Sequence, residues 1–290
     1  MASVPEAPSV HVCSSPEQLV RQLKALPPVP KIMLRLQPML ADCNTDINDV
    51  ANLIRLERSL AARLIQVSNS AYMGLGSRAR SVEEAINRLG FREVRRIVSV
   101  VIGMHIMEKP LPAYGIDARD LWRQSIACAI AAELFAPNMG EDGDAAYTLG
   151  LLHSVGMVVV NAWAAMVAPQ TRLASQGYPD DCTQAERALL GFTNADTGAE
   201  LLRMWDFPDS VVDPVRAQYQ PVLASTQPQL AHLLLVSRWM RSAVCDPAMP
   251  QVMPDPRSMS VVGVDESALR DAVGLVRERL DEATKLLEPS

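Results

Sequence analysis

The chain has 290 residues, of which 49% are hydrophobic and 21% charged, and these fractions are ordinary for a globular protein with a substantial core. Its formal net charge of -6 gives no overall attraction to phosphate backbones or anionic lipid, although it does not exclude a local basic patch. None of the cysteines has CxxC spacing, which argues against a zinc knuckle or a disulfide framework and predicts reduced thiols at Cys13, Cys43, Cys128, Cys182 and Cys245.

The composition predicts an all-α fold. Aromatic residues supply only 4% of the chain, so aliphatic side chains at helical spacing must fill the core, which favours helix packed on helix. No uninterrupted apolar run approaches the roughly 20 residues that cross a bilayer. Residues 1–14 lack the basic start and hydrophobic stretch of a secretory signal. We therefore expect a cytoplasmic protein without membrane insertion.

Capping signals and prolines divide the first part of the chain into short helices. Ser15 precedes Pro16 and Gln18, which is a strong helix start, and the prolines of 26–30 end that helix near residue 25. Gly90 is expected to end another helix in the left-handed conformation. The predicted helices are 15–25, about 31–41, a segment from Asp46 or Asn48 to about 56, one capped by Ser59, 81–90 opened by the Ser81–Glu84 capping box, and 92–107.

Pro110 and Pro112 mark the most plausible internal boundary, and the second part of the chain again reads as helices. A Pro-rich loop is predicted over 246–258. The helices expected here run from Asp117 to Pro137, from Asp144 to His153, over 183–191 with a capping box at Thr183–Glu186, from Asn194 or Asp196 to 205, as one kinked or two short helices around Pro208 and Pro214, over 230–243, and from Asp265 onward.

Six segments, in this order, resemble the HDOD family of bacterial regulatory modules. They are 26–30 (LPPVP), 60–72 (LAARLIQVSNSAY), 81–90 (SVEEAINRLG), 121–125 (LWRQS), 150–156 (GLLHSVG) and 198–208 (GAELLRMWDFP). The resemblance implies a fold related to HD phosphohydrolases, with a helical bundle packed on an HD-like core, and a role in signalling. It divides the chain into a tail (1–14), an N-terminal bundle (15–112), an HD-like core (113–244) and a C-terminal loop and helix that pack on the core (245–290).

The same resemblance locates the positions where HD phosphohydrolases hold divalent metals. Those enzymes use a histidine on one helix, a His-Asp pair on the next and a later aspartate, and the metal activates the attacking water. Here these positions correspond to Gln124, to His153 with Ser154, and to Ser237. Further histidine positions of metal-binding relatives match Asn194 and residues 218–220. Only His153 stays a good ligand, so we expect no metal cofactor and no catalytic residues, because neutral oxygens compensate poorly for desolvating a dication.

His153 allows two interpretations. It is either a core histidine hydrogen-bonded to neighbours such as Gln124, or part of a relic pocket that binds a small nucleotide without turning it over. The relic pocket would contain Gln124, His153, Ser154, Asn194 and Ser237. Serine hydrolysis is disfavoured, because no GxSxG elbow occurs and adjacent side chains on a helix point about 100° apart.

Two groups of residues are candidates for an interaction surface. Arg92, Arg95 and Arg96 have helical neighbour spacing, and one interpretation of segment 81–100 is a helix-turn-helix DNA reader. The favoured alternative is a solvated face paired with Glu83, Glu84 and Glu93. The second group, Asn69, Ser70 and Tyr72, forms either the last turn of a helix or a docking surface between the two lobes.

Taken together, the sequence predicts a non-enzymatic regulatory protein that binds other signalling proteins. One alternative is a residual metal-dependent nucleotide phosphohydrolase. The other is a DNA-binding regulator, which the acidic composition disfavours.

Overall fold

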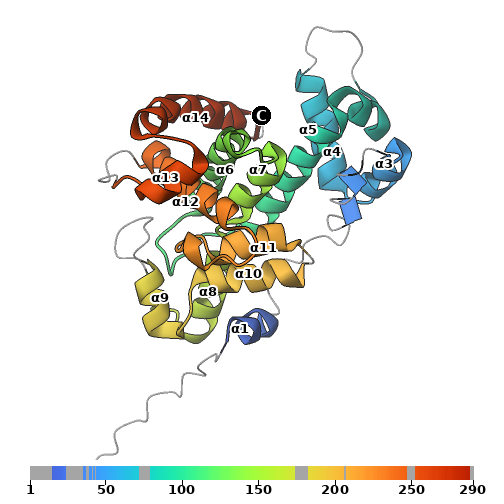
Figure 1. The fold of residues 1–290 in the computed structure, drawn as a ribbon. Coiled ribbons are helices and arrows are strands. Elements are labelled where there is room, and N and C mark those ends of the chain that lie inside the picture. Colours follow the sequence, from blue (N-terminus) through green and yellow to red (C-terminus); the bar gives the residue numbers. More distant parts are fainter. Residues whose placement is uncertain are drawn as a thin grey trace, which may run out of the picture.

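The structure is a computed structural model that describes residues 15–23, 35–36, 39–40, 42, 44–71, 79–173, 182–205, 207–246 and 252–287. Within these residues the regular elements are helices, together with one isolated β-bridge between Leu111 and Ile116. The predicted all-α fold is therefore confirmed, and Figure 1 shows a small group of helices beside a larger one.

The smaller group, called here the N-terminal lobe, consists of α3 (Ile47–Arg55), α4 (Arg58–Ala71) and α5 (Val82–Ile106), which pack on one another. As expected, Asp46 caps α3 and Ser81 caps α5 through side-chain oxygens that accept backbone N–H groups. Gly90 has φ 75° and ψ 161°, so its positive φ fits glycine, but its ψ is extended and not left-handed helical. The chain therefore kinks at Gly90 and continues as a helix.

The larger group is called here the C-terminal lobe, and α14 covers α6 and α12 on its outside (Figure 1). Its elements are α6 (Ala118–Phe135), η1 (Ala136–Met139), α7 (Gly143–Leu152), α8 (Val155–Val167), α9 (Cys182–Leu190), α10 (Asn194–Met204), α11 (Asp209–Arg216), η2 (Pro221–Leu223), α12 (Pro228–Cys245), α13 (Pro256–Val262) and α14 (Glu266–Leu287).

Two glycines set the tightest packing in this lobe. A Cβ atom on Gly150 would lie 2.7 Å from the Cα atom of Ala129, so α7 can approach α6 only without a side chain there. A Cβ atom on Gly156 would lie 1.7 Å from the carbonyl oxygen of Asn194, which fixes α8 on α10 in the same way. His153 and Ser154 lie between these two glycines, and the close packing holds them in position.

Helix α1 (Pro16–Gln22) contacts α10 and α8 and lies beside the C-terminal lobe (Figure 1). Its buried residues Leu19 and Val20 supply the apolar contact. The N-terminal bundle expected over 15–112 includes α1, whose described contacts are with helices of the C-terminal lobe. Its last helical residue is Gln22, three residues before the predicted end.

Some residues predicted as caps do not cap their helices, whereas α10 begins at Asn194, one of its two predicted starts. Ser59 lies inside α4, and Asp142, not Asp144, caps α7. Thr183 lies inside α9, and the cap of α10 is Thr193, whose capping-box partner is Asp196. The predicted loop at 246–258 includes the start of α13 at Pro256, and Pro214 lies within the single helix α11.

Among the described residues, one segment has the length and hydropathy of a membrane span, namely Gly143–Val167. No such segment was expected from the sequence. The structure divides this segment into α7 and α8 at His153 and Ser154. In the most apolar part of this segment, 72% is buried inside the protein, as expected for a pair of core helices. Length and composition alone are weak evidence for a membrane span.

Candidate functional site

His153 lies between α7 and α8 and is 2% exposed. Its Nδ1 atom is 2.6 Å from the carbonyl oxygen of Gly150, and its Nε2 atom is 2.9 Å from Nη1 of Arg241. A carbonyl only accepts and a guanidinium only donates, so Nδ1 carries the proton and Nε2 accepts from Arg241. Burial, followed by the charges of Arg241 and Arg238, holds the pKa of His153 well below its usual value. The imidazole is therefore neutral.

Two arginines of α12, Arg238 and Arg241, extend into the same buried region and are 6% and 2% exposed. The Nη1 atom of Arg238 donates to the carbonyl oxygen of Gln218 at 3.0 Å, and its guanidinium lies 4.0 Å from the ring centroid of Tyr219. Gln218 in turn donates from Nε2 to the carbonyl oxygen of His153 at 2.9 Å. The arginines thus tie α12 to the turn that contains His153.

Two of the serines predicted for the relic pocket form hydrogen bonds within the fold. Ser154 and Ser125 share a hydrogen bond of 3.0 Å between their hydroxyl oxygens, and Ser237 donates to the carbonyl oxygen of Leu233 at 2.8 Å. The Oε1 atom of Gln124 is buried and accepts no hydrogen bond within the described residues. The expected bond between His153 and Gln124 was therefore wrong, and Gly150 and Arg241 take its place.

Asn194 belongs to a buried network around Glu186. The carboxylate of Glu186 accepts from the backbone N–H of Asn194 at 2.8 Å, from its Nδ2 atom at 3.0 Å and from the hydroxyl of Tyr114 at 2.5 Å. Nδ2 of Asn194 also donates to the Tyr219 hydroxyl at 2.9 Å. Burial raises the pKa of Glu186, while the hydrogen bonds from Tyr114 and Asn194 oppose that shift.

The predicted basic surface turns toward the other lobe. Arg92 pairs with Asp144 at 3.2 Å, Arg95 with Asp142 at 3.6 Å, and Arg96 with Glu133 at 2.7 Å. The expected partners were Glu83, Glu84 and Glu93; none of them forms an ion pair with these arginines in the described contacts, although Glu93 attracts Arg96 electrostatically. Glu83 instead pairs with Arg55, and Glu84 accepts from the backbone N–H of Arg80.

The second predicted surface can be followed only at Asn69. Its Oδ1 atom accepts from the backbone N–H of Ala79 at 2.7 Å, so its amide joins the end of α4 to the start of the next described segment. The side chain of Ser70 and the whole of Tyr72 lie outside the described residues.

The residues present do not fit the metal centre that HD phosphohydrolases use. Within the described parts of the chain, no group of three His, Cys, Asp or Glu side chains is placed to hold a metal. The one imidazole lone pair that remains, on Nε2 of His153, already accepts from a cation. A dication would therefore face a positive charge where these enzymes provide anionic ligands. We derive no catalytic step through such a metal.

Sequence reasoning missed the residues that define this site, namely Arg238, Arg241, Glu186 and Tyr114. A usable signal existed for the arginines, because two charges three residues apart interrupt the otherwise apolar helix over 230–243. Glu186 fitted a capping box, so its sequence context pointed to the wrong role.

An all-α fold with His153 between two core helices and two buried arginines beside it is an HD-like helical domain. The HDOD domain model matches residues 26–221, and the chain belongs to the HDOD family.

Known proteins agree with this assignment at the level of the fold. A crystal structure named as a candidate phosphohydrolase of Shewanella amazonensis SB2B is 23% identical, with a TM-score of 0.71 over 96% of this chain and 100% of that one. An HDOD domain protein from Geobacter sulfurreducens is 20% identical, with a TM-score of 0.66 over 92% and 97% of the two chains.

Two further relatives are longer than the matched region. A candidate signal transduction protein of Marinobacter aquaeolei VT8 is 22% identical with a TM-score of 0.68, over 96% of this chain and 62% of that one. An uncharacterized protein of Treponema pallidum (strain Nichols) is 24% identical over 213 residues, which are 69% of this chain and 40% of that protein. The chain thus spans about two fifths of that relative.

Proposed function

We propose that this protein is a non-enzymatic bacterial signalling protein that acts in the cytoplasm by binding other signalling proteins. The observation that supports this proposal best is the hydrogen bond from Arg241 to Nε2 of His153. It turns the one remaining metal-ligand position into an internal contact of the fold.

The charge of Arg241 would repel a metal ion at His153, and the size of this repulsion can be approximated. Two unit charges 4 Å apart repel by about 4 kcal/mol at the effective dielectric of a protein, and a dication beside Arg241 would feel about twice that. Gln124, Ser154 and Ser237 offer no negative charge to offset the repulsion. Metal binding would therefore require Arg241 to leave a site where it is 2% exposed.

The regulatory part of the proposal rests on family membership and on a fold relative named as a candidate signal transduction protein. The alternative of a residual nucleotide phosphohydrolase draws on the relative from Shewanella amazonensis. DNA reading through segment 81–100 is the less favoured alternative, because Arg92, Arg95 and Arg96 already pair with carboxylates of the C-terminal lobe.

Metal analysis of the purified protein tests the proposal against the phosphohydrolase. We expect far less than one equivalent of Fe, Mn or Zn after incubation with each metal and dialysis, and no hydrolysis of a phosphodiester or a phosphomonoester. Stoichiometric metal, removable by a chelator together with a phosphatase activity, would reject it.

A variant with restored donors is the matched control. The substitutions Gln124→His, Ser154→Asp, Ser237→Asp and Arg241→Ala, made together, replace neutral and cationic groups with ligands of the HD type. If this variant binds metal under conditions where the natural chain does not, the assay detects the site. Pull-down from a bacterial lysate followed by mass spectrometry then tests for signalling partners, and the absence of any retained protein would count against the regulatory role.

A further inference from the structure

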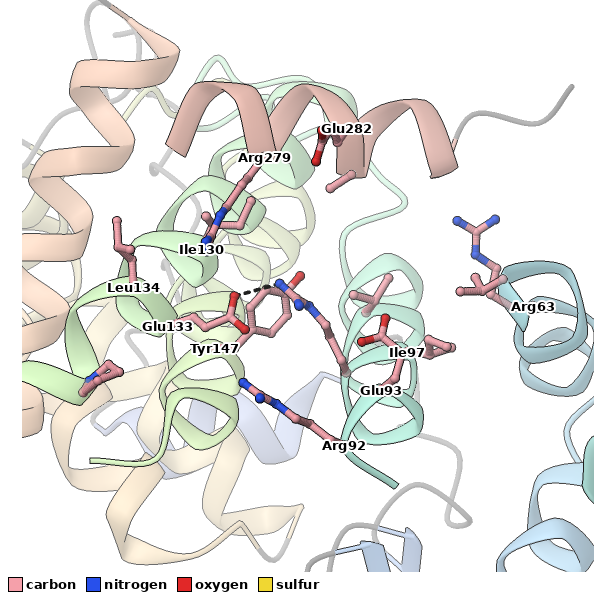
Figure 2. A pocket seen from close by; sticks show the side chains of 15 residues that line it. Arg63, Arg92, Glu93, Ile97, Ile130, Glu133, Leu134, Tyr147, Arg279 and Glu282 are labelled. Carbon is pink, nitrogen blue, oxygen red and sulfur yellow. Dashed lines mark hydrogen bonds and ion pairs between the residues drawn. The ribbon is translucent and has the colours of Figure 1, made fainter. Parts of the chain in front are cut away.

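A cavity lies between the two lobes, and none of its lining residues is His153 or a residue of α12. It has a volume of about 760 Å³ and is lined by α4 and α5 on one side and by α6, α7 and α14 on the other (Figure 2). That volume is within the range of small-molecule sites, about 300–1,000 Å³. Part of the lining is apolar, with Ile97, Val100, Ile130 and Leu134.

Arg96 is held in a defined orientation at the wall of this cavity. Its Nη2 atom lies 2.7 Å from Oε2 of Glu133, and its guanidinium carbon lies 4.8 Å from the ring centroid of Tyr147. The side chain stays 34% exposed although Tyr147 is buried. A guanidinium plane held in this way is a stacking surface for a flat aromatic ligand such as a nucleobase.

Arg279 supplies a cation that forms no ion pair within the described part of the chain. It extends from α14 into the cavity, on the side where Glu133 and Tyr147 lie (Figure 2), and it forms no ion pair or hydrogen bond with the described residues. Arg63 lies across the cavity on α4 and is half-buried, and burial lowers the pKa of its guanidinium. Arginine binds phosphate through two parallel hydrogen bonds, so a phosphate group suits this side of the cavity.

Carboxylates also line the cavity, and they disfavour ligands that carry only negative charge. Glu133 is engaged with Arg96, whereas Glu93 and Glu282 have no hydrogen bond or ion pair with the described residues. With four arginines and three glutamates in the lining, a simple polyanion would meet repulsion as well as attraction. A molecule with phosphate at one end and amine or hydroxyl donors at the other can satisfy both kinds of group.

We propose that the cavity between the lobes binds a nucleotide, with the base stacked on Arg96, the phosphate held by Arg279, and ring or sugar donors facing Glu93 or Glu282. This ligand would join the N-terminal lobe to the C-terminal lobe, so its binding would bias their relative arrangement. The proposal is independent of the metal question, because none of these residues touches His153 or Arg241 in the described contacts.

Binding is measured by calorimetry and by the shift in Tm of the full chain, with AMP, ADP, GMP and GDP as probes. Adenosine, guanosine and inorganic pyrophosphate are the controls that lack one half of the ligand. We expect at least one nucleotide to bind at least tenfold more tightly than its nucleoside and than pyrophosphate. No binding of any nucleotide at millimolar concentration, or equal binding of pyrophosphate, would overturn the proposal.

Matched variants locate the site. Arg279→Gln should weaken nucleotide binding at least tenfold, whereas Arg277→Gln should leave it unchanged, since Arg277 is also exposed on α14 but does not line the cavity. Arg96→Lys keeps the charge beside Glu133 and removes the flat surface, so it should weaken binding at least tenfold and lower Tm less than Arg96→Gln does. Equal affinities for Arg279→Gln and Arg277→Gln would place the ligand elsewhere and refute this assignment.

Discussion

The buried centre around His153 and the cavity between the lobes both contain arginines, but these differ in burial and in hydrogen bonding. At the centre, Arg241 and Gln218 bind groups of the fold itself, and His153 is almost inaccessible. In the cavity, Arg279 is exposed to solvent and its charge has no partner in the described structure. The polar groups around His153 are therefore bound within the core, whereas Arg279 is open to a ligand where the lobes meet.

The rigidity of the centre is tested most strongly at Gly156. Gly156→Ala should destabilise the fold by about 3 kcal/mol or more, because the new methyl group would overlap the carbonyl oxygen of Asn194, 1.7 Å away, and the backbone has little room to move. Denaturant unfolding followed by circular dichroism measures the loss.

Gly274→Ala is the control for that substitution. Nothing lies within 4 Å of a Cβ atom at position 274, so alanine in this helix should stabilise by about 0.5–1 kcal/mol. Similar unfolding midpoints for the two variants would show that the backbone around Gly156 can shift to accommodate a methyl group, against the tight packing described above.

The network that encloses the centre is tested at Tyr114. Tyr114→Phe removes the hydroxyl that donates to Glu186 and should cost about 1–3 kcal/mol, because one carboxylate oxygen then loses a donor inside the core. Since that donor also opposes the rise in the pKa of Glu186, the variant should hold its Glu186 proton to a higher pH. Unfolding free energies at pH 5 and pH 8 measure both effects, and an unchanged stability at pH 8 would contradict the role of this hydrogen bond.

The depressed pKa of His153 predicts a pH dependence of stability. The unfolded chain binds a proton near pH 6.5 and the folded chain does not, so stability is complete above that pH and falls as pH decreases toward the lower folded pKa. At pH 5.5, one unit below the unfolded pKa, the loss should be about 1.4 kcal/mol.

His153→Gln isolates this contribution, because His232, whose pKa burial also lowers, is unchanged in both proteins. The difference in unfolding free energy between pH 8 and pH 5.5 should be smaller in the variant by about 1.4 kcal/mol. Equal pH dependence in the two proteins would mean that the histidine is accessible, and the contrast between a closed centre and an open cavity would fail.

The sequence predicts elements better than it predicts contacts. Ser15, Asp46, Ser81 and Asp117 each cap the helix they were expected to cap, because a cap depends on atoms within three residues. Thr183 and Glu186 match the same pattern, yet Glu186 instead binds Asn194, eight residues later and in the next helix, and Tyr114, 72 residues earlier.

The candidate site shows the same limit. The family resemblance predicted neutral side chains at Gln124, Ser154 and Ser237 where HD phosphohydrolases hold metal ligands, but it could not show which residues surround His153. Arg241 reaches His153 across 88 positions of sequence, and only the packing of α12 on the core brings the two together. Arg92, Arg95 and Arg96 were recognised as a basic face, but their partners come from the other lobe.

The smallest expected effect concerns the boundary between the lobes. Arg95 and Asp142 are 3.6 Å apart, and the carboxylate is 58% exposed, so Arg95→Gln should cost less than about 1 kcal/mol. Arg96→Gln should cost more, because its partner Glu133 is only 11% exposed and the contact with Tyr147 is lost as well. Raising the salt concentration from 0.05 M to 0.5 M should reduce the first cost and leave much of the second, since screening acts mainly on exposed charges. If both variants lose the same stability and respond equally to salt, then Arg96 is no more restrained than a surface arginine, and the cavity loses the preorganised wall that sets it apart from the rest of the surface.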